Sequence, residues 1–123
     1  MIKEACGIFG IANHPDAAAI TRLGLFALQH RGQESAGIEI LRAGKCELHK
    51  GMGLVSEVFD RLPKEWWKNP QEMAIGHVRY STFGGSNIAN AQPFMAEFDK
   101  WRLGLAHNGT ISNASHWRSH LKR

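Results

Sequence analysis

The pattern of apolar and polar positions along the chain predicts strands and helices in mixed order. Short apolar or alternating runs predict strands at 6–12, 36–41, 45–50, 73–80, 94–98 and 101–107. Apolar residues at helical spacing predict helices from 15 to about 30, from 54 to 62 and from 114 to 121. Residues 63–70 and 83–93 are predicted to be loops, the first with a further helical turn as an alternative. This order predicts a layered α/β or α+β domain.

Individual residues refine these predicted elements. In the strand at 6–12 the apolar residues occupy both faces, so we expect both faces of that strand to be covered. Pro15 and Asp16 suit the first turn of the first helix, and Asn113 can cap the last one. Little chain follows the last helix to pack against it, so we expect this sequence to be part of a longer domain.

Composition and charge restrict the class of protein. The 123 residues are 43% hydrophobic, which supports a folded domain, and their net charge of +4 includes no run of five like charges. No apolar run approaches the roughly 18 residues of a membrane span, and the N-terminus does not resemble a secretory signal. Cys6 and Cys46 form neither a C-x-x-C pair nor a disulfide framework. We therefore expect a cytoplasmic protein.

Cys6 is the candidate nucleophile. If residues 1–5 are a leader that is removed, Cys6 carries a thiol and a free α-amine. The thiolate is the reactive form of cysteine, and an α-amine with a pKa of about 7.7–8.0 can accept the thiol proton near neutral pH. This stretch alone is also typical of a small buried hydrophobic residue. The other motifs of the chain favour the nucleophile.

Several further stretches are specific in composition and order. They are LQHRGQESAGI (28–38), GLVSEVF (53–59), GHVRYST (76–82), NAQP (90–93) and AHNGTISN (106–113). Together with CGIFG (6–10), they resemble the class II, or N-terminal nucleophile, glutamine amidotransferases, and within that class the amidophosphoribosyltransferase family. The resemblance extends over positions 6 to 113 in the order of the family.

The resemblance implies a fold and a reaction. The fold is α+β, the four-layer α-β-β-α sandwich of Ntn hydrolases, incomplete in this chain. Residues 1–5 correspond to the leader and 6–123 to the N-terminal portion of the glutamine amidotransferase type 2 domain. The family hydrolyses glutamine through a thioester, here on Cys6. The ammonia then reacts with phosphoribosyl pyrophosphate in a second domain and forms 5-phosphoribosylamine, in de novo purine (IMP) biosynthesis.

The resemblance also implies roles for single residues. Asn108 and Gly109 match the oxyanion site, through an amide side chain and a backbone N–H, and Arg79 matches the residue that binds the α-carboxylate of glutamine. Four further residues match positions near the nucleophile or along the pocket: Arg31, Gly32, His77 and Tyr80. Considered without the family, Asn108-Gly109 is also typical of a type I′ hairpin turn, and Arg79 of a strand end that reaches solvent.

Parts of the family pattern have no match in this chain. A Ser-Asp-Thr-type motif of the glutamine pocket and the phosphoribosyltransferase domain are absent, so we expect little or no glutaminase activity and no transferase activity from this chain alone. Mg²⁺ belongs to the absent domain, and the iron–sulfur cluster of some members binds later cysteines, so no cofactor is expected here. Glutamine is the expected ligand, and phosphoribosyl pyrophosphate requires the missing domain. No nucleic-acid or membrane partner is expected, and the full-length enzyme is expected to be a homo-oligomer.

Three alternatives stay open. A basic interaction module could bind nucleic acid through Trp66, Trp67 and the charged C-terminal helix, although adjacent Trp residues more often pack an element onto a core. His116 and His120 have the spacing of metal ligands, but Trp117 stands where H-E-x-x-H has its Glu. The third alternative is the glutaminase domain of another class II enzyme, such as glucosamine-6-phosphate synthase or asparagine synthetase, and the motif at 28–38 argues against it.

Overall fold

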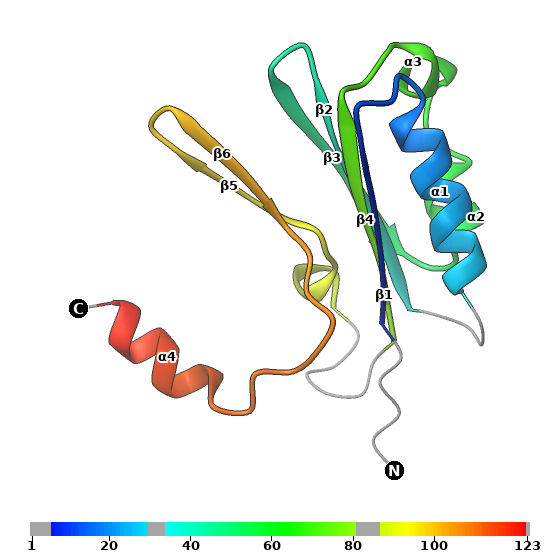
Figure 1. Ribbon diagram of the computed structural model, residues 1–123. Helices are drawn as coiled ribbons and strands as arrows, with labels where there is room; N and C mark the ends of the chain where they lie inside the picture. The colour runs from blue at the N-terminus through cyan, green and yellow to red at the C-terminus, as the bar shows by residue number, and fades with distance from the viewer. Residues whose placement is uncertain (1–5, 30–33, 81–86, 123) are drawn as a thin grey trace.

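The structure is a computed structural model that describes residues 6–29, 34–80 and 87–122 (Figure 1). Its strands are β1 (Gly7–Ala12), β2 (Ser35–Arg42), β3 (Lys45–Met52), β4 (Met73–Arg79), β5 (Phe94–Phe98) and β6 (Trp101–Leu105). Its helices are α1 (Ala17–Leu28), α2 (Val55–Phe59), α3 (Lys64–Lys68) and α4 (Ala114–Leu121), with a 3₁₀ turn at Ile88–Asn90.

Two antiparallel sheets form the frame of the fold. The larger sheet has four strands in the order β1-β4-β2-β3, and each neighbouring pair is antiparallel. β5 and β6 form a separate two-stranded hairpin. In Figure 1 this hairpin lies on one side of the large sheet, and α1 and α2 lie on the other side. The described elements therefore include three successive layers, α-β-β, with α4 on the side of the hairpin.

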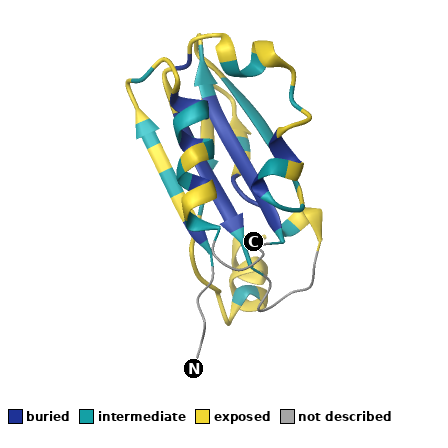
Figure 2. Cartoon of the chain, turned by 90° about the vertical axis from the view of Figure 1, so that its right-hand side faces the viewer, coloured by how far each residue is buried: buried dark blue, intermediate teal, exposed yellow. Residues whose placement is uncertain are grey.

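The hydrophobic core lies between the large sheet and α1. Because side chains alternate along a strand, Ala36, Ile38 and Ile40 of β2 point to one face, and all three are at most 1% exposed. Leu25 of α1 and Val78 of β4 join them in the same core. Figure 2 shows these central strands as the most buried part of the chain, behind α1. Since a fully buried aliphatic side chain stabilises by about 1.5–3 kcal/mol, this layer contributes strongly to stability.

Two glycines let α1 approach the sheet closely. A Cβ at Gly76 of β4 would lie 2.6 Å from Thr21 Cγ2 and 2.8 Å from Leu25 Cδ1. A Cβ at Gly24 of α1 would lie 2.3 Å from the ring of Phe9 in β1. Glycine lowers intrinsic helix stability by up to about 1 kcal/mol relative to alanine, and here packing against the sheet requires it.

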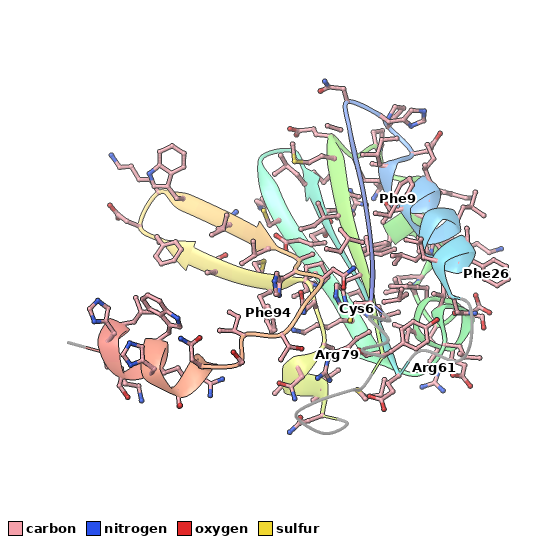
Figure 3. The ribbon with its side chains drawn as sticks, turned by 60° about the horizontal axis from the view of Figure 1, so that its bottom comes forward. Cys6, Phe9, Phe26, Arg61, Arg79 and Phe94 are labelled. Carbon is pink, nitrogen blue, oxygen red and sulfur yellow. The ribbon has the colours of Figure 1, made fainter. Side chains whose placement is uncertain are left out.

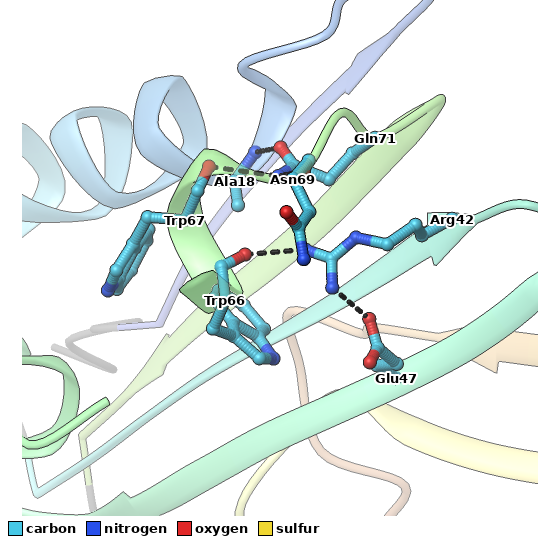
Figure 4. Close-up of polar contacts among 7 residues, drawn as sticks. All are labelled: Ala18, Arg42, Glu47, Trp66, Trp67, Asn69 and Gln71. Carbon is cyan, nitrogen blue, oxygen red and sulfur yellow. Dashed lines mark hydrogen bonds and ion pairs between the residues drawn. The ribbon is translucent and has the colours of Figure 1, made fainter. Parts of the chain in front are cut away.

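The chain between α3 and β4 is tied to the core by polar contacts (Figure 4). Gln71 Oε1 accepts a hydrogen bond from the Ala18 backbone N–H at 3.0 Å, and Gln71 Nε2 donates to the Trp67 carbonyl at 3.1 Å. Arg42 of β2 donates to the Trp66 carbonyl. Trp66 and Trp67 themselves pack, partly buried, against the core. The prediction that this Trp pair packs onto the core is therefore confirmed.

Most predicted elements are confirmed, and two expectations are wrong. Residues 64–68 form α3, so the helical turn is the correct alternative to a loop. Only one face of β1 is covered by the described residues: Phe9 packs on the core, whereas Ile8 is 41% exposed. On the side of Ile8, the 91–104 segment packs against Gly37 and Glu39 of β2 and Lys50 of β3. Asn113 occupies the N-cap position of α4, but its side chain makes no capping hydrogen bond.

Replacing Gly76 with alanine should destabilise the contact between helix and sheet. The new methyl group would overlap Thr21 and Leu25, so we expect a loss of about 1–3 kcal/mol in the free energy of unfolding, measured by urea denaturation. Gly10→Ala is the matched control in β1, where the new Cβ would meet nothing closer than 3.6 Å. Equal stability of the two variants would contradict the close packing of α1 on β4.

Candidate active site

One face of the large sheet carries the candidate nucleophile and the candidate carboxylate-binding residue. Gly7 and Gly76 both face α1, since a Cβ on either would contact that helix. Because side chains alternate along a strand, Cys6 and Arg79 belong to the opposite face, which the hairpin faces. Gly7 pairs with Val78, so Cys6 and Arg79 also lie at the same end of the sheet. Figure 3 shows both side chains at this end.

The two cysteines have different surroundings. Cys6 is half-buried and free, directly before the first residue of β1. Cys46 of β3 is also free, but burial and the neighbouring Glu39 carboxylate raise the pKa of its thiol. Since the thiolate is the reactive form, Cys46 is poorly suited to nucleophilic chemistry.

The segment after β6 brings Asn108 and Gly109 toward the same end. β6 crosses β2 at Gly104, where a Cβ would lie 2.4 Å from the Glu39 carboxylate. The chain then reaches β4, where the His107 carbonyl lies 3.1 Å from His77 Nε2. Glu39 lies toward the far end of β2 and His77 close to Arg79, so the chain runs toward the Cys6 end as it enters Asn108.

Asn108-Gly109 is not a hairpin turn. β5 and β6 are joined by the turn at Asp99-Lys100, since Phe98 pairs with Trp101. Asn108 and Gly109 follow the end of β6 and are exposed. Gly109 has a φ of 151°, a conformation that favours glycine. The alternative of a type I′ hairpin turn is therefore wrong, and the exposed pair is available to a ligand.

His77 of β4 contacts the backbone of this segment at His107. Its side chain has no exposed surface, and burial lowers its pKa from 6.5 to about 4. The ring is therefore neutral at pH 7, and Nε2 can donate its proton to the His107 carbonyl. With no exposed surface, His77 acts on the site through the backbone that it holds.

The remaining site predictions have different outcomes. Tyr80 directly follows Arg79 and is half-buried, at the Cys6 end of the sheet. Arg31, Gly32 and residues 1–5 lie outside the described residues, so the structure says nothing of them.

The sequence predictions assigned no role to the loop at residues 91–93 or to Lys50. The backbone carbonyl of Gln92 is packed onto β2, where a Cβ at Gly37 would lie 2.1 Å from its oxygen. Lys50 of β3 donates from Nζ to the Ala91 carbonyl at 2.7 Å, and burial lowers the pKa of this lysine. A lysine in an alternating strand gives no sign of such a contact, because the partner is a backbone group 41 residues away.

Other parts of the described chain offer weaker sites. A cavity of about 420 Å³ lies between the two sheets, at the far end from Cys6, lined among others by Glu39, Cys46 and Trp101. Within residues 6–29, 34–80 and 87–122, no three His, Cys, Asp or Glu side chains are grouped as metal ligands. The rings of His116 and His120 both pack edge-on against Trp117. None of the helices in these ranges is long and apolar enough to cross a membrane.

Comparison with known proteins identifies the class. A family model described as "Glutamine amidotransferases class-II" matches residues 55–122, which is more than half of the chain. The chain therefore belongs to the class II glutamine amidotransferases, as its motifs indicate.

The relatives within this class are more specific. The chain is 44% identical to the amidophosphoribosyltransferase of Staphylococcus aureus (strain Mu50) over 99% of its own length and 24% of the relative's. It is 46% identical to the amidophosphoribosyltransferase of Lacticaseibacillus casei, covering 98% of this chain and 62% of that protein.

A solved structure has the same fold. Glutamine phosphoribosylpyrophosphate amidotransferase from B. subtilis, complexed with ADP and GMP, matches with a TM-score of 0.78 and 43% identity over 94% of this chain and 24% of that chain. The predicted α+β fold and family resemblance are thus confirmed. The chain spans about a quarter of the length of most of these relatives.

The stability of the protein should fall in mild acid because of His77. Its pKa is about 4 when folded and near 6.5 when unfolded, so the unfolded state binds the proton first as the pH falls. The contribution of His77 is complete above pH 6.5 and is lost toward pH 4, an expected loss of about 3 kcal/mol. Denaturation at several pH values measures it.

His77→Gln isolates this effect from the other histidines. Glutamine keeps an N–H donor for the His107 carbonyl but does not titrate in this range. The variant should therefore lose less stability between pH 6.5 and 4 than the wild type. If the two proteins lose the same amount, His77 is not the buried neutral group that the structure shows.

Proposed function

We propose that this chain is the glutamine-hydrolysing part of an amidophosphoribosyltransferase, with Cys6 as the nucleophile. The observation that carries the proposal is the convergence of Cys6, Arg79 and the 106–109 segment at one end of one sheet face. Each motif comes from a different part of the sequence: strand pairing brings Cys6 and Arg79 to one end, and packing of the hairpin on the sheet brings the 106–109 segment there.

The reaction begins with the thiol of Cys6 after residues 1–5 have been removed. The free α-amine takes the thiol proton, and the thiolate attacks the side-chain carbonyl carbon of glutamine. The carbon–nitrogen bond then breaks, the nitrogen takes up the proton and leaves as ammonia, and a thioester remains on Cys6. Water attacks the thioester, releases glutamate and restores the thiol.

Three residues would orient and stabilise the reacting glutamine. The Asn108 side-chain amide and the Gly109 N–H would donate to the oxyanion that forms on the attacked carbonyl, and removing one such donor costs roughly 3–4 kcal/mol of transition-state stabilisation in other enzymes. The Arg79 guanidinium would bind the α-carboxylate of glutamine with two parallel hydrogen bonds.

The second half of the activity would require the rest of the polypeptide. We propose that the ammonia reacts with phosphoribosyl pyrophosphate in a phosphoribosyltransferase domain and forms 5-phosphoribosylamine, in the cytoplasm and in a homo-oligomer. Mg²⁺ and any iron–sulfur cluster would also belong to that part. The donor set of this chain does not fit a four-thiolate cluster, since it contains two cysteines, 40 positions apart.

Labelling of the full-length polypeptide by an electrophilic glutamine analogue should require Cys6. We expect the intact mass to lack residues 1–5 and to gain one adduct. Cys6→Ala should abolish the adduct, whereas Cys46→Ala should retain it, because burial and Glu39 keep the Cys46 thiol protonated. A processed protein that is labelled equally well without Cys6 would exclude Cys6 as the nucleophile.

Arg79→Gln should weaken glutamine binding in the full-length polypeptide. Because hydrogen bonds to charged groups contribute about 1.5–3 kcal/mol, KM for glutamine should rise roughly 10- to 100-fold, with a smaller effect on kcat. Arg102→Gln is the matched control, since Arg102 lies on the exposed hairpin and pairs with Glu97 at 3.1 Å. An unchanged KM in Arg79→Gln would mean that another residue binds the carboxylate.

A further inference from the structure

The backbone of His107 is held on both sides by side chains from two other motifs. Its N–H donates to Gln92 Oε1 at 2.6 Å, and its carbonyl lies 3.1 Å from His77 Nε2. The peptide unit is planar, so the His107 carbonyl shares a plane with the N–H of Asn108. The two contacts therefore fix the peptide planes before and after His107, and with them the direction in which the chain enters Asn108 and Gly109.

Gln92 accepts with its side chain a hydrogen bond that a residue in a strand would accept with its backbone carbonyl. In the hairpin, Phe94 pairs with Leu105, and the same register continued by two residues places Gln92 opposite His107. The backbone carbonyl of Gln92 points instead at β2, as its contact with Gly37 shows. The side-chain carbonyl accepts the His107 N–H in its place.

Gln92 is itself held firmly. Gln92 is 9% exposed, and its neighbours in the chain, Ala91 and Pro93, are 0% and under 2% exposed. Lys50 of β3 donates to the Ala91 carbonyl at 2.7 Å and lies 3.4 Å from the Pro93 carbonyl. Because Gly37 of β2 leaves room for the loop, Gln92 is fixed to the same sheet that carries Arg79.

We propose that Gln92 is a positioning residue of the amidase site: its side-chain carbonyl holds the segment that presents Asn108 and Gly109 to the developing oxyanion. The inference rests on the proposed function. Gln92 touches neither glutamine nor the thiol and acts through His107. A displacement of about 1 Å in a catalytic group can cost on the order of 100-fold in rate, so the loss belongs to the chemical step rather than to glutamine binding.

The test uses Gln92→Met in the full-length polypeptide, which keeps the chain length and removes the acceptor. We expect kcat for glutamine hydrolysis to fall roughly 10- to 100-fold with little change in KM. Gln92→Glu should retain most of the wild-type kcat, because a carboxylate oxygen can accept the same N–H. This rescue separates the hydrogen bond from simple packing.

Gln71→Met is the matched control (Figure 4). Gln71 is also buried, at 5% exposed, and its Oε1 also accepts a backbone N–H, that of Ala18, but on the side of α1. Its variant should lose thermal stability without a selective loss of kcat. Equal losses of kcat in Gln71→Met and Gln92→Met, or a loss in Gln92→Met that lies wholly in KM, would overturn the proposal.

Hydrogen exchange gives a readout that does not depend on activity. Amides in the 106–110 segment should exchange faster in Gln92→Met than in the wild type, and at the wild-type rate in Gln71→Met. Unchanged exchange in Gln92→Met would overturn the positioning role even in an active enzyme. Conversely, a wild-type protein that shows the expected exchange but does not hydrolyse glutamine would overturn the proposed function instead.

Discussion

The register of β4 between β1 and β2 is the constraint on which the site depends. β4 places Val78 opposite Gly7 of β1 and Arg79 opposite Ser35 of β2. The register of both neighbouring strands is therefore set by β4. A shift of one residue would turn every side chain of β4 to the other face and bury Arg79 against α1. Gly76 prevents this shift, because only a residue without Cβ fits beneath Thr21 and Leu25.

The hairpin depends on the same sheet through contacts between glycines and polar groups. Gly37 of β2 receives the Gln92 carbonyl, and Gly104 of β6 lies against the Glu39 carboxylate. His77 then meets the His107 backbone in the same interface. The close approaches at Gly37 and Gly104 restrict how the hairpin can lie on the sheet, and the His107 carbonyl gives the buried His77 ring the polar partner that it needs. Burial also keeps His77 neutral at pH 7 and raises the pKa of Glu39.

The strands and helices could be predicted from the sequence because the patterns that cause them lie within each segment. The two hairpins, at 36–50 and 94–107, follow from alternating residues on either side of short polar turns. The first and last helices follow from apolar spacing. By contrast, the exposure of Ile8 depends on which strands the 91–104 segment covers, and no pattern within β1 records that. The predicted capping hydrogen bond of Asn113 is absent for a similar reason: a suitable residue at the N-cap position does not guarantee the geometry of the bond.

The sequence by itself determined the elements, the class and the candidate groups Cys6, Arg79, Asn108 and Gly109, because residue type and order carry that information. Tertiary structure alone decided which groups share a face, that Asn108-Gly109 is not a hairpin turn, and that Gln92 and His77 hold one backbone segment between them. The physical reason is distance along the chain. His77 and His107 are 30 residues apart and Lys50 and Ala91 are 41 apart, so packing of the sheets creates these contacts and local preference does not.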